Sequence, residues 1–196
     1  MSFNSRTLLY FWSIVSLLLN LLLINHFLTS NSTSFIVDED DIGIDFAFSG
    51  MENNPKTLLL DTINKAEETL DIAMYNFEDT DIAEAILEAK DRGVTVRLFT
   101  DEDKAKTDNN AAILDAFTKN GIEAKVNTAQ KMHLKMVIID NEQVVTGSYN
   151  FTEESAYENQ EQLLTLINEE ISRQWTDIYD ELWGSRIMKN GMISII

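Results

Sequence analysis

The sequence predicts an α/β domain in which a mixed, mainly parallel sheet is flanked by helices. Segments with alternating or continuous apolar residues, typical of strands, take turns with segments whose apolar residues recur at helical spacing. Glycines follow two of the helical segments, at Gly93 and Gly121, where a helix commonly ends. Strands and helices that alternate at this rhythm are typical of α/β folds with parallel strands.

The predicted elements follow one another along the chain. Strands are expected at residues 42–49, 70–77, 94–100, 122–127 and 160–167, and helices at 56–70, 81–92, 111–119 and 169–183. Residues 133–140 and 142–148 predict two further strands that a turn at Asp140 joins into a hairpin. A short helix is expected from Phe151, with Thr152 or Asn150 near its N-cap.

The N-terminal segment has the composition of a membrane-spanning helix. Residues 8–24 are almost entirely apolar, which is near the lower end of the ~17–25 residues that span a bilayer. Arg6 precedes this run and no charged residue follows before Asp38, so the folded domain is expected on the extracytoplasmic side. We expect an anchor at residues 1–28, with a cleaved signal peptide and a secreted domain as the alternative.

The remaining chain divides into two parts. A polar and then acidic linker is expected at residues 29–41, and the folded domain at residues 42–196. The domain carries the negative charge, because Arg6 is the one charged residue before Asp38 and the whole chain has a net charge of −18. Such a domain repels polyanions at long range, which argues against a nucleic-acid coat protein but not against a local basic groove.

Two features of the composition bear on chemistry. The most basic stretch contains four lysines at positions 119, 125, 131 and 135, and it leads into the predicted hairpin. The sequence has no cysteine, which excludes disulfides, thiolate metal sites and a cysteine nucleophile.

One histidine, His133, stands in the predicted domain, since His26 lies in the N-terminal apolar segment. In a strand the side chains of His133 and Lys135 share a face, and Ser148 and Asn150 follow the hairpin. An imidazole, an ammonium, a hydroxyl and an amide at one point suit a phosphoryl oxyanion, and histidine can attack phosphorus or move a proton. Alone, however, a histidine and lysine pair is more often solvated surface.

The full pattern is more specific than the pair. The spacing His133-x-Lys135, four residues, Asp140, six residues, Gly147-Ser148-x-Asn150 resembles the signature motif of the phospholipase D superfamily. The later Asn159-x-Glu161 and the stretch from Leu70 to Asp103 resemble the small members with one motif copy, which are compact bacterial endonucleases and mitochondrial cardiolipin hydrolases. The resemblance covers about residues 42–184 and departs at Gly50, where many relatives have proline.

The resemblance implies a catalytic domain that cleaves phosphodiesters through a phosphohistidine and needs two histidines. His133 would be the nucleophile in one protomer and the general acid and base in the other. Because one chain supplies one motif, a homodimer with a shared active site is expected. No cofactor and no metal is implied.

The resemblance also implies roles for the other motif residues. Lys135 and Asn150 would bind the phosphoryl oxygens, and Ser148 would add a hydrogen bond. Glu161 would orient His133 through its far nitrogen. Asp140 is a further candidate site residue, with a structural role as the alternative.

Two substrate classes stay open. The predicted anchor and the acidic domain favour a membrane phospholipid, whereas the lysine stretch and the likeness to small endonucleases favour DNA or RNA. A third possibility, a non-catalytic anchored binding module, is disfavoured because the five residues of the expected site are all present, namely His133, Lys135, Ser148, Asn150 and Glu161.

Overall fold

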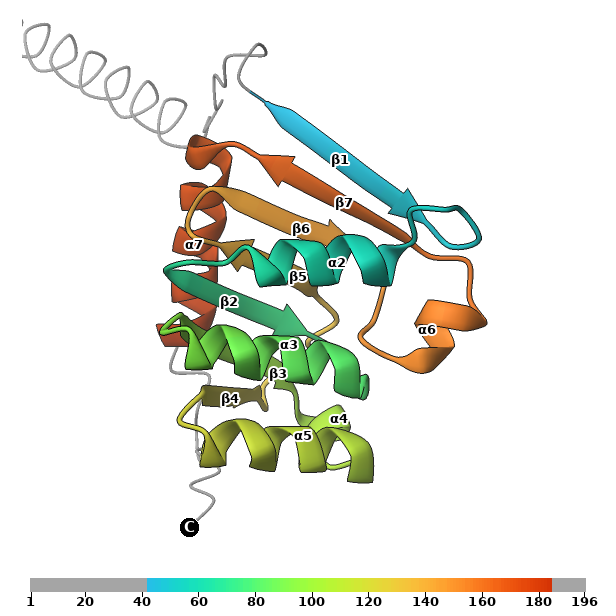
Figure 1. The fold of residues 1–196 in the computed structure, drawn as a ribbon. Helices are drawn as coiled ribbons and strands as arrows, with labels where there is room; N and C mark the ends of the chain where they lie inside the picture. Colours follow the sequence, from blue (N-terminus) through green and yellow to red (C-terminus); the bar gives the residue numbers. More distant parts are fainter. Residues whose placement is uncertain (1–41, 185–196) are drawn as a thin grey trace, which may run out of the picture. The chain divides into compact units, whose positions relative to one another are not determined.

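A mixed seven-stranded sheet forms the centre of residues 42–184, the part of the chain that the computed structural model describes (Figure 1). The strand order is β1-β7-β6-β5-β2-β3-β4. The strands are β1 (Gly43–Phe48), β2 (Thr69–Met74), β3 (Thr95–Asp101), β4 (Glu123–Asn127), β5 (Lys135–Ile139), β6 (Gln143–Gly147) and β7 (Gln162–Ile167). The helices are α2 (Pro55–Asn64), α3 (Thr80–Asp91), α4 (Glu102–Ala105), α5 (Asp108–Lys119), α6 (Glu153–Tyr157) and α7 (Glu169–Gly184).

The mixed α/β sheet is confirmed, but the prediction that it is mainly parallel is wrong. Strand β3 pairs in parallel with β2 and β4, while the four pairings along β1-β7-β6-β5-β2 are antiparallel. The cause lies in the connections. Helices α3 and α5 provide the long crossovers that parallel neighbours need, whereas the tight turn between β5 and β6 can only reverse the chain.

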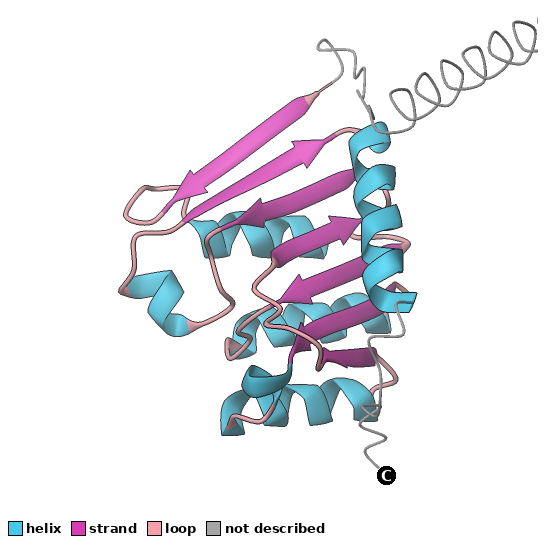
Figure 2. Ribbon diagram, turned by 180° about the vertical axis from the view of Figure 1, so that it is seen from behind, coloured by secondary structure: helices cyan, strands magenta, loops and turns pink. Residues whose placement is uncertain are grey.

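Helices cover both faces of the sheet (Figures 1 and 2). Helices α2, α3 and α5 lie on one face and α7 crosses the other. The larger core lies under the three helices, where Ile63, Ile86 and Phe117 are fully buried. The smaller core lies under α7, where Met136, Ile138 and other buried side chains surround Tyr179. Each central strand therefore has apolar side chains on both faces, as expected for a sheet between two helix layers.

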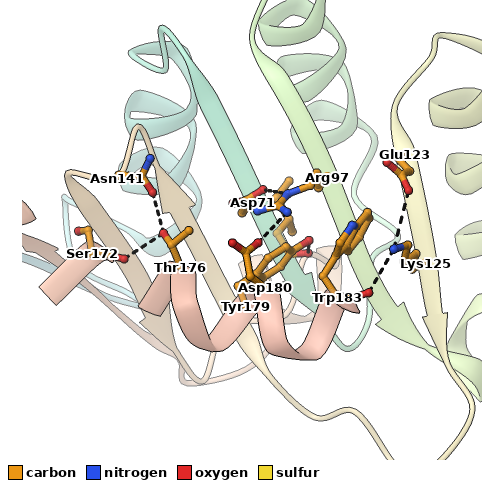
Figure 3. Close-up of polar contacts among 11 residues, drawn as sticks. Asp71, Arg97, Glu123, Lys125, Asn141, Ser172, Thr176, Tyr179, Asp180 and Trp183 are labelled. Carbon is orange, nitrogen blue, oxygen red and sulfur yellow. Dashed lines mark hydrogen bonds and ion pairs between the residues drawn. The ribbon is translucent and has the colours of Figure 1, made fainter. Parts of the chain in front are cut away.

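Arg97 joins helix α7 to the sheet (Figure 3). The guanidinium forms two hydrogen bonds of 2.6 Å with Asp71 of β2 and one of 2.7 Å with Asp180 of α7. It also lies over the rings of Tyr179 and Trp183, 4.9 and 5.4 Å from their centroids. A planar cation can satisfy carboxylates with its edge and aromatic rings with its face at the same time.

Local capping explains several helix boundaries. Asp79 is the N-cap of α3, and its carboxylate accepts from the backbone N–H groups of residues 81 and 82. Asp101 caps α4, a single turn that the apolar periodicity did not indicate. Thr152 caps α6 by accepting from the N–H of Ser155 at 3.1 Å, which confirms that prediction.

The turn of the β5–β6 hairpin lies where it was predicted. Asp140 and Asn141 both have positive φ, 54° and 56°, as a tight right-twisted hairpin turn requires. The Asp140 carboxylate accepts three backbone N–H groups, those of Glu67, Glu68 and Thr69, at 2.8–2.9 Å. Asp140 therefore ties the hairpin turn to the loop that enters β2.

The predicted anchor (1–28) and linker (29–41) fall outside the described residues. Within residues 42–184, none of the helices combines the length and apolar character that crossing a bilayer requires.

We expect Asp140→Ala to lower the free energy of unfolding by about 2–4 kcal/mol, because three N–H groups lose a charged acceptor. Urea denaturation measures the change. Asp61→Ala, which removes an exposed carboxylate from α2, is the matched control and should change stability by no more than about 0.5 kcal/mol. An equally small change for Asp140→Ala would contradict the structural role.

Candidate active site

The residues of the expected site gather at one edge of the sheet. The strand directions place the carboxyl ends of β1, β2, β3 and β6 at the same edge as the amino ends of β5 and β7. The arrowheads of β1, β2 and β6 point to this edge in Figure 1, where α6 also lies. Loops that leave these strand ends can therefore converge although they are far apart in the sequence.

His133 lies in the loop just before β5, not in the strand as predicted, and its side chain is exposed. The loop is fastened to the end of β2, because the N–H of Tyr75 donates to the carbonyl of Leu134 at 3.0 Å. The ring of Tyr75 packs against the imidazole, with 4.5 Å between the centroids and an interplanar angle of 55°. Tyr75 thus supports one side of the histidine ring.

Lys135 begins β5 and turns back toward the histidine. Its ammonium lies 3.4 Å from the carbonyl oxygen of His133. Burial lowers the pKa of Lys135, and the neighbouring Lys131 lowers it further, while Glu161 acts in the opposite direction. The lysine therefore stands in a setting where an added anion would be favourable.

The surroundings of His133 favour its neutral form. Partial removal from water lowers the pKa of the imidazole, and the positive charges of Lys135 and Lys131 lower it further, against a smaller opposing effect of Asp101. A neutral imidazole retains the nitrogen lone pair that a nucleophile or a base needs.

Glu161 holds the serine of the motif. One carboxylate oxygen accepts from the Ser148 hydroxyl, and the other accepts from Ser155 at 3.3 Å and from Asn159 at 3.4 Å. No hydrogen bond joins Glu161 to His133 in the described part of the chain, so the orienting role expected for Glu161 stays a prediction.

Gly147 allows this contact to form. The N–H of Ser148 donates to the carbonyl of Gln162 at 3.1 Å. A Cβ on Gly147 would overlap that same carbonyl oxygen. Only glycine permits so close an approach of β6 to the amino end of β7.

Asn150 is positioned by the two aromatic residues beside it. Tyr149 and Phe151 are buried, and the backbone of Phe151 bonds to residues 76, 78 and 79 behind β2. The Asn150 side-chain oxygen is buried and has no hydrogen-bond partner within residues 42–184. This oxygen can only accept hydrogen bonds, so a phosphoryl oxygen would be bound by the NH₂ group of the same amide.

The structure thus brings five of the six predicted site residues to one edge and separates the sixth. His133, Lys135, Ser148, Asn150 and Glu161 lie there, on or beside strand ends, whereas Asp140 lies at the opposite edge in the hairpin turn. Of the lysine stretch, Lys131 and Lys135 are at the site. Lys119 pairs instead with Asp115 on α5, and Lys125 lies over Trp183 on the α7 side.

Sequence reasoning missed Tyr75 and Lys104. Tyr75 lies inside the strand predicted at residues 70–77 but just after the observed end of β2, and Lys104 follows the strand predicted at residues 94–100. Nearness to the carboxyl ends of parallel strands is the signal that could have found them, because ligand sites gather there. The Lys104 ammonium lies 5.3 Å from the centroid of the Tyr75 ring.

The edge combines a neutral imidazole, ammonium groups, a hydroxyl and a buried amide, and these groups suit an anion that carries a reacting phosphorus. Within residues 42–184 no group of three or more histidine or acidic side chains is arranged to hold a metal ion.

Comparisons with known proteins identify relatives of this chain. A family model described as cardiolipin synthase, PLD-like domain, matches residues 59–183. A mitochondrial cardiolipin hydrolase of Chlamydomonas reinhardtii is 33% identical over 63% of this chain and 55% of its own length. A phospholipase D of Rickettsia bellii is 30% identical over 68% of this chain and 64% of its own length. The chain thus spans less than two thirds of these curated relatives.

Solved structures show the same fold. The phospholipase D family member Nuc of Salmonella typhimurium matches with a TM-score of 0.70 and 26% identity, over 73% of this chain and 95% of that one. NucT of Helicobacter pylori matches with a TM-score of 0.68 and 23% identity, over 74% and 98% of the two chains. With a family model that covers most of the chain and a matching fold, this protein belongs to the phospholipase D superfamily, in its subgroup with one motif copy per chain.

Proposed function

We propose that this chain is a phosphodiesterase that cleaves its substrate through a phosphohistidine. The observation that carries the proposal is the setting of His133, an exposed imidazole with a lowered pKa, supported by Tyr75 and next to the ammonium of Lys135. The names of the curated relatives support the same reaction class.

In the proposed mechanism, a nitrogen of His133 attacks phosphorus while Lys135 and Asn150 bind the phosphoryl oxygens. The new N–P bond replaces the P–O bond of the ester, and the leaving oxygen takes a proton from a second imidazole. That imidazole then removes a proton from water, which attacks phosphorus and releases His133. The Ser148 hydroxyl donates its one proton to Glu161 in the free chain, and it would donate a hydrogen bond to the phosphoryl group by turning this proton from the carboxylate to the substrate.

The second imidazole is proposed to be the partner's His133 in a homodimer. His133 is the one histidine of the chain outside the N-terminal segment, so a symmetric pair is the simplest source of two. Apolar side chains surround the edge and are open to solvent in one chain: Phe48, Met51, Leu134 and Tyr157 are 44, 62, 42 and 73% exposed. Their burial against a second copy would bring the two histidines together.

For the substrate, a phospholipid and a nucleic acid are both supported. The curated relatives are named cardiolipin hydrolase and phospholipase D. An anchor at residues 1–28 would place the domain beside a membrane, on its extracytoplasmic side. If this segment were a signal peptide and were cleaved, the domain would be secreted. The ammonium groups at the site favour nucleic acid as the second candidate. Against nucleic acid stands the net charge of −18, which weakens the long-range attraction of a polyanion.

His133→Asn should lower the rate of phosphodiester cleavage by at least about 10⁴-fold, since the nucleophile is lost. The purified full chain would be assayed with a chelator present on cardiolipin, phosphatidylcholine, single-stranded DNA and RNA. Circular dichroism would verify that the variant is folded. Cleavage that survives in folded His133→Asn would refute the covalent mechanism.

Mixed dimers test the shared site. Wild-type and His133→Asn chains refolded together should show total activity that follows the square of the wild-type fraction, because a mixed dimer lacks one of the two roles. Activity that falls in direct proportion would show that each chain works alone. Lys65→Gln, exposed at the far end of α2, is the control partner and should leave total activity unchanged.

The pH profile tests the setting of His133. Since partial burial and two lysines lower the pKa of His133 from its ordinary value, the acid limb of kcat/KM should lie at a lower pH than the titration of a free imidazole. Lys131→Gln removes a positive charge that disfavours the imidazolium, so the pKa should rise and the acid limb should move to higher pH. Lys65→Gln should leave the limb in place, and an unmoved limb in Lys131→Gln would contradict the electrostatic coupling.

A further inference from the structure

Three ammonium groups converge on one aromatic ring beside His133. The side chains of Lys131, Lys104 and Lys135 place their nitrogens 4.8, 5.3 and 5.3 Å from the centroid of Tyr75. Two of these nitrogens can therefore be no farther apart than the sum of their distances from the centroid of the ring. They come from three separate parts of the chain, α4, the loop before β5 and β5 itself, so the convergence is a product of the fold.

These lysines, which we call the lysine cluster, have no carboxylate partner within residues 42–184. The ion pairs of that region instead involve lysines 56, 106, 119 and 125. The chain has 33 acidic and 15 basic side chains, so carboxylates are plentiful and a group of neighbouring lysines without an ion pair is unusual. Their mutual repulsion is unfavourable, and an anion bound among them would relieve it.

Two acidic residues close to Lys104 in the sequence are already engaged. Asp101 is buried and accepts from the backbone N–H groups of Asp103, Lys104 and Met132 at 2.9–3.3 Å. Glu102 pairs with Lys106 at 2.8 Å, on the exposed side of α4. Neither forms an ion pair with the lysine cluster, which keeps its charge available to a ligand.

One phosphate does not need all three cations. Lys135 follows His133 by two residues and serves the phosphate under attack in the proposed mechanism. Lys104 and Lys131 approach Tyr75 as well, and the motif assigns them no part. We propose that Lys104 and Lys131, held against Tyr75, form a subsite for a second phosphate group of the substrate, next to the phosphate that His133 attacks.

The inference rests on the proposed phosphodiesterase function and narrows its substrate. The substrate class is a bis-phosphodiester in which a short carbon chain joins two phosphates. Cardiolipin and a nucleic-acid strand share this unit, because a three-carbon bridge separates consecutive phosphate esters in both. A subsite for two phosphates joined in this way would explain why the site suits either cardiolipin or nucleic acid. Lipids with one phosphate would then be poorer substrates.

Matched substrates with one and two phosphates test the subsite. The nucleotide pair is the thymidine dinucleotide, with one phosphodiester, and the trinucleotide, with two. The lipid pair is phosphatidylglycerol and cardiolipin in mixed micelles. The full chain and its Lys104→Gln and Lys131→Gln variants would be compared by the maximum of kcat/KM in the pH profile of each protein, so that a shift in the pKa of His133 does not enter the comparison.

Each variant should lose about tenfold in kcat/KM on the two-phosphate member of a pair, mainly through KM, and change by less than about twofold on the one-phosphate member. The pair that shows this selective loss identifies the source of the second phosphate, lipid or nucleic acid. Lys65→Gln carries the same charge change at the other edge and should affect neither member.

Two results would overturn the subsite. Equal losses on both members of each pair would mean that the lysines act on the attacked phosphate or on the overall field. No loss on any substrate would mean that they bind nothing. If the wild-type chain cleaves no substrate at all, the proposed function itself fails and the inference falls with it, which separates the two failures.

Discussion

The Asp140 carboxylate accepts hydrogen bonds from three backbone N–H groups. These hydrogen bonds determine where the site residues lie, although Asp140 is at the opposite edge of the sheet. They tie the hairpin turn to the entry of β2 and thereby set the register of β5 against β2, in which Lys135 lies opposite Met74. From that register, His133 reaches Tyr75 at the other end of the strands. A residue without contact to substrate can thus hold the site as firmly as one that touches it.

The same hairpin explains the spacing of the motif. Strands β5 and β6 have five residues each, and residues 140–142 turn between them. The chain therefore leaves the edge that holds the candidate site after Lys135, turns at Asp140 and returns to that edge at Gly147. There, the close contact between β6 and β7 brings Ser148 to Glu161. The intervals between the motif residues therefore equal the lengths of β5, the turn and β6. A one-residue insertion in either strand would move the side chains that follow the insertion to the other face of the sheet.

Local signals carried most of the sequence prediction, and long-range pairing accounts for what it missed. The hairpin, the Thr152 cap and the edge position of five site residues follow from turn chemistry, capping and motif spacing. Strand direction does not, because nothing local to β7 or β1 states which neighbour it will have. For the same reason Tyr75 and Lys104 were missed, and Lys125 was wrongly grouped with Lys131: β4 turns Lys125 toward α7, whereas the loop turns Lys131 toward Tyr75.

The proposed dimer faces a constraint that a two-motif chain can avoid. Its two active histidines are identical in sequence, yet the reaction needs one neutral and one protonated. Partial burial, Lys135 and Lys131 lower the pKa of each imidazole. Two imidazoliums across an axis would also repel one another, so the pair would take up protons in two coupled steps. The first proton then creates the general acid and leaves the other histidine as the nucleophile. A dimer with a symmetric structure can therefore carry an asymmetric charge. The lysines near each histidine help to prevent protonation of the second imidazole.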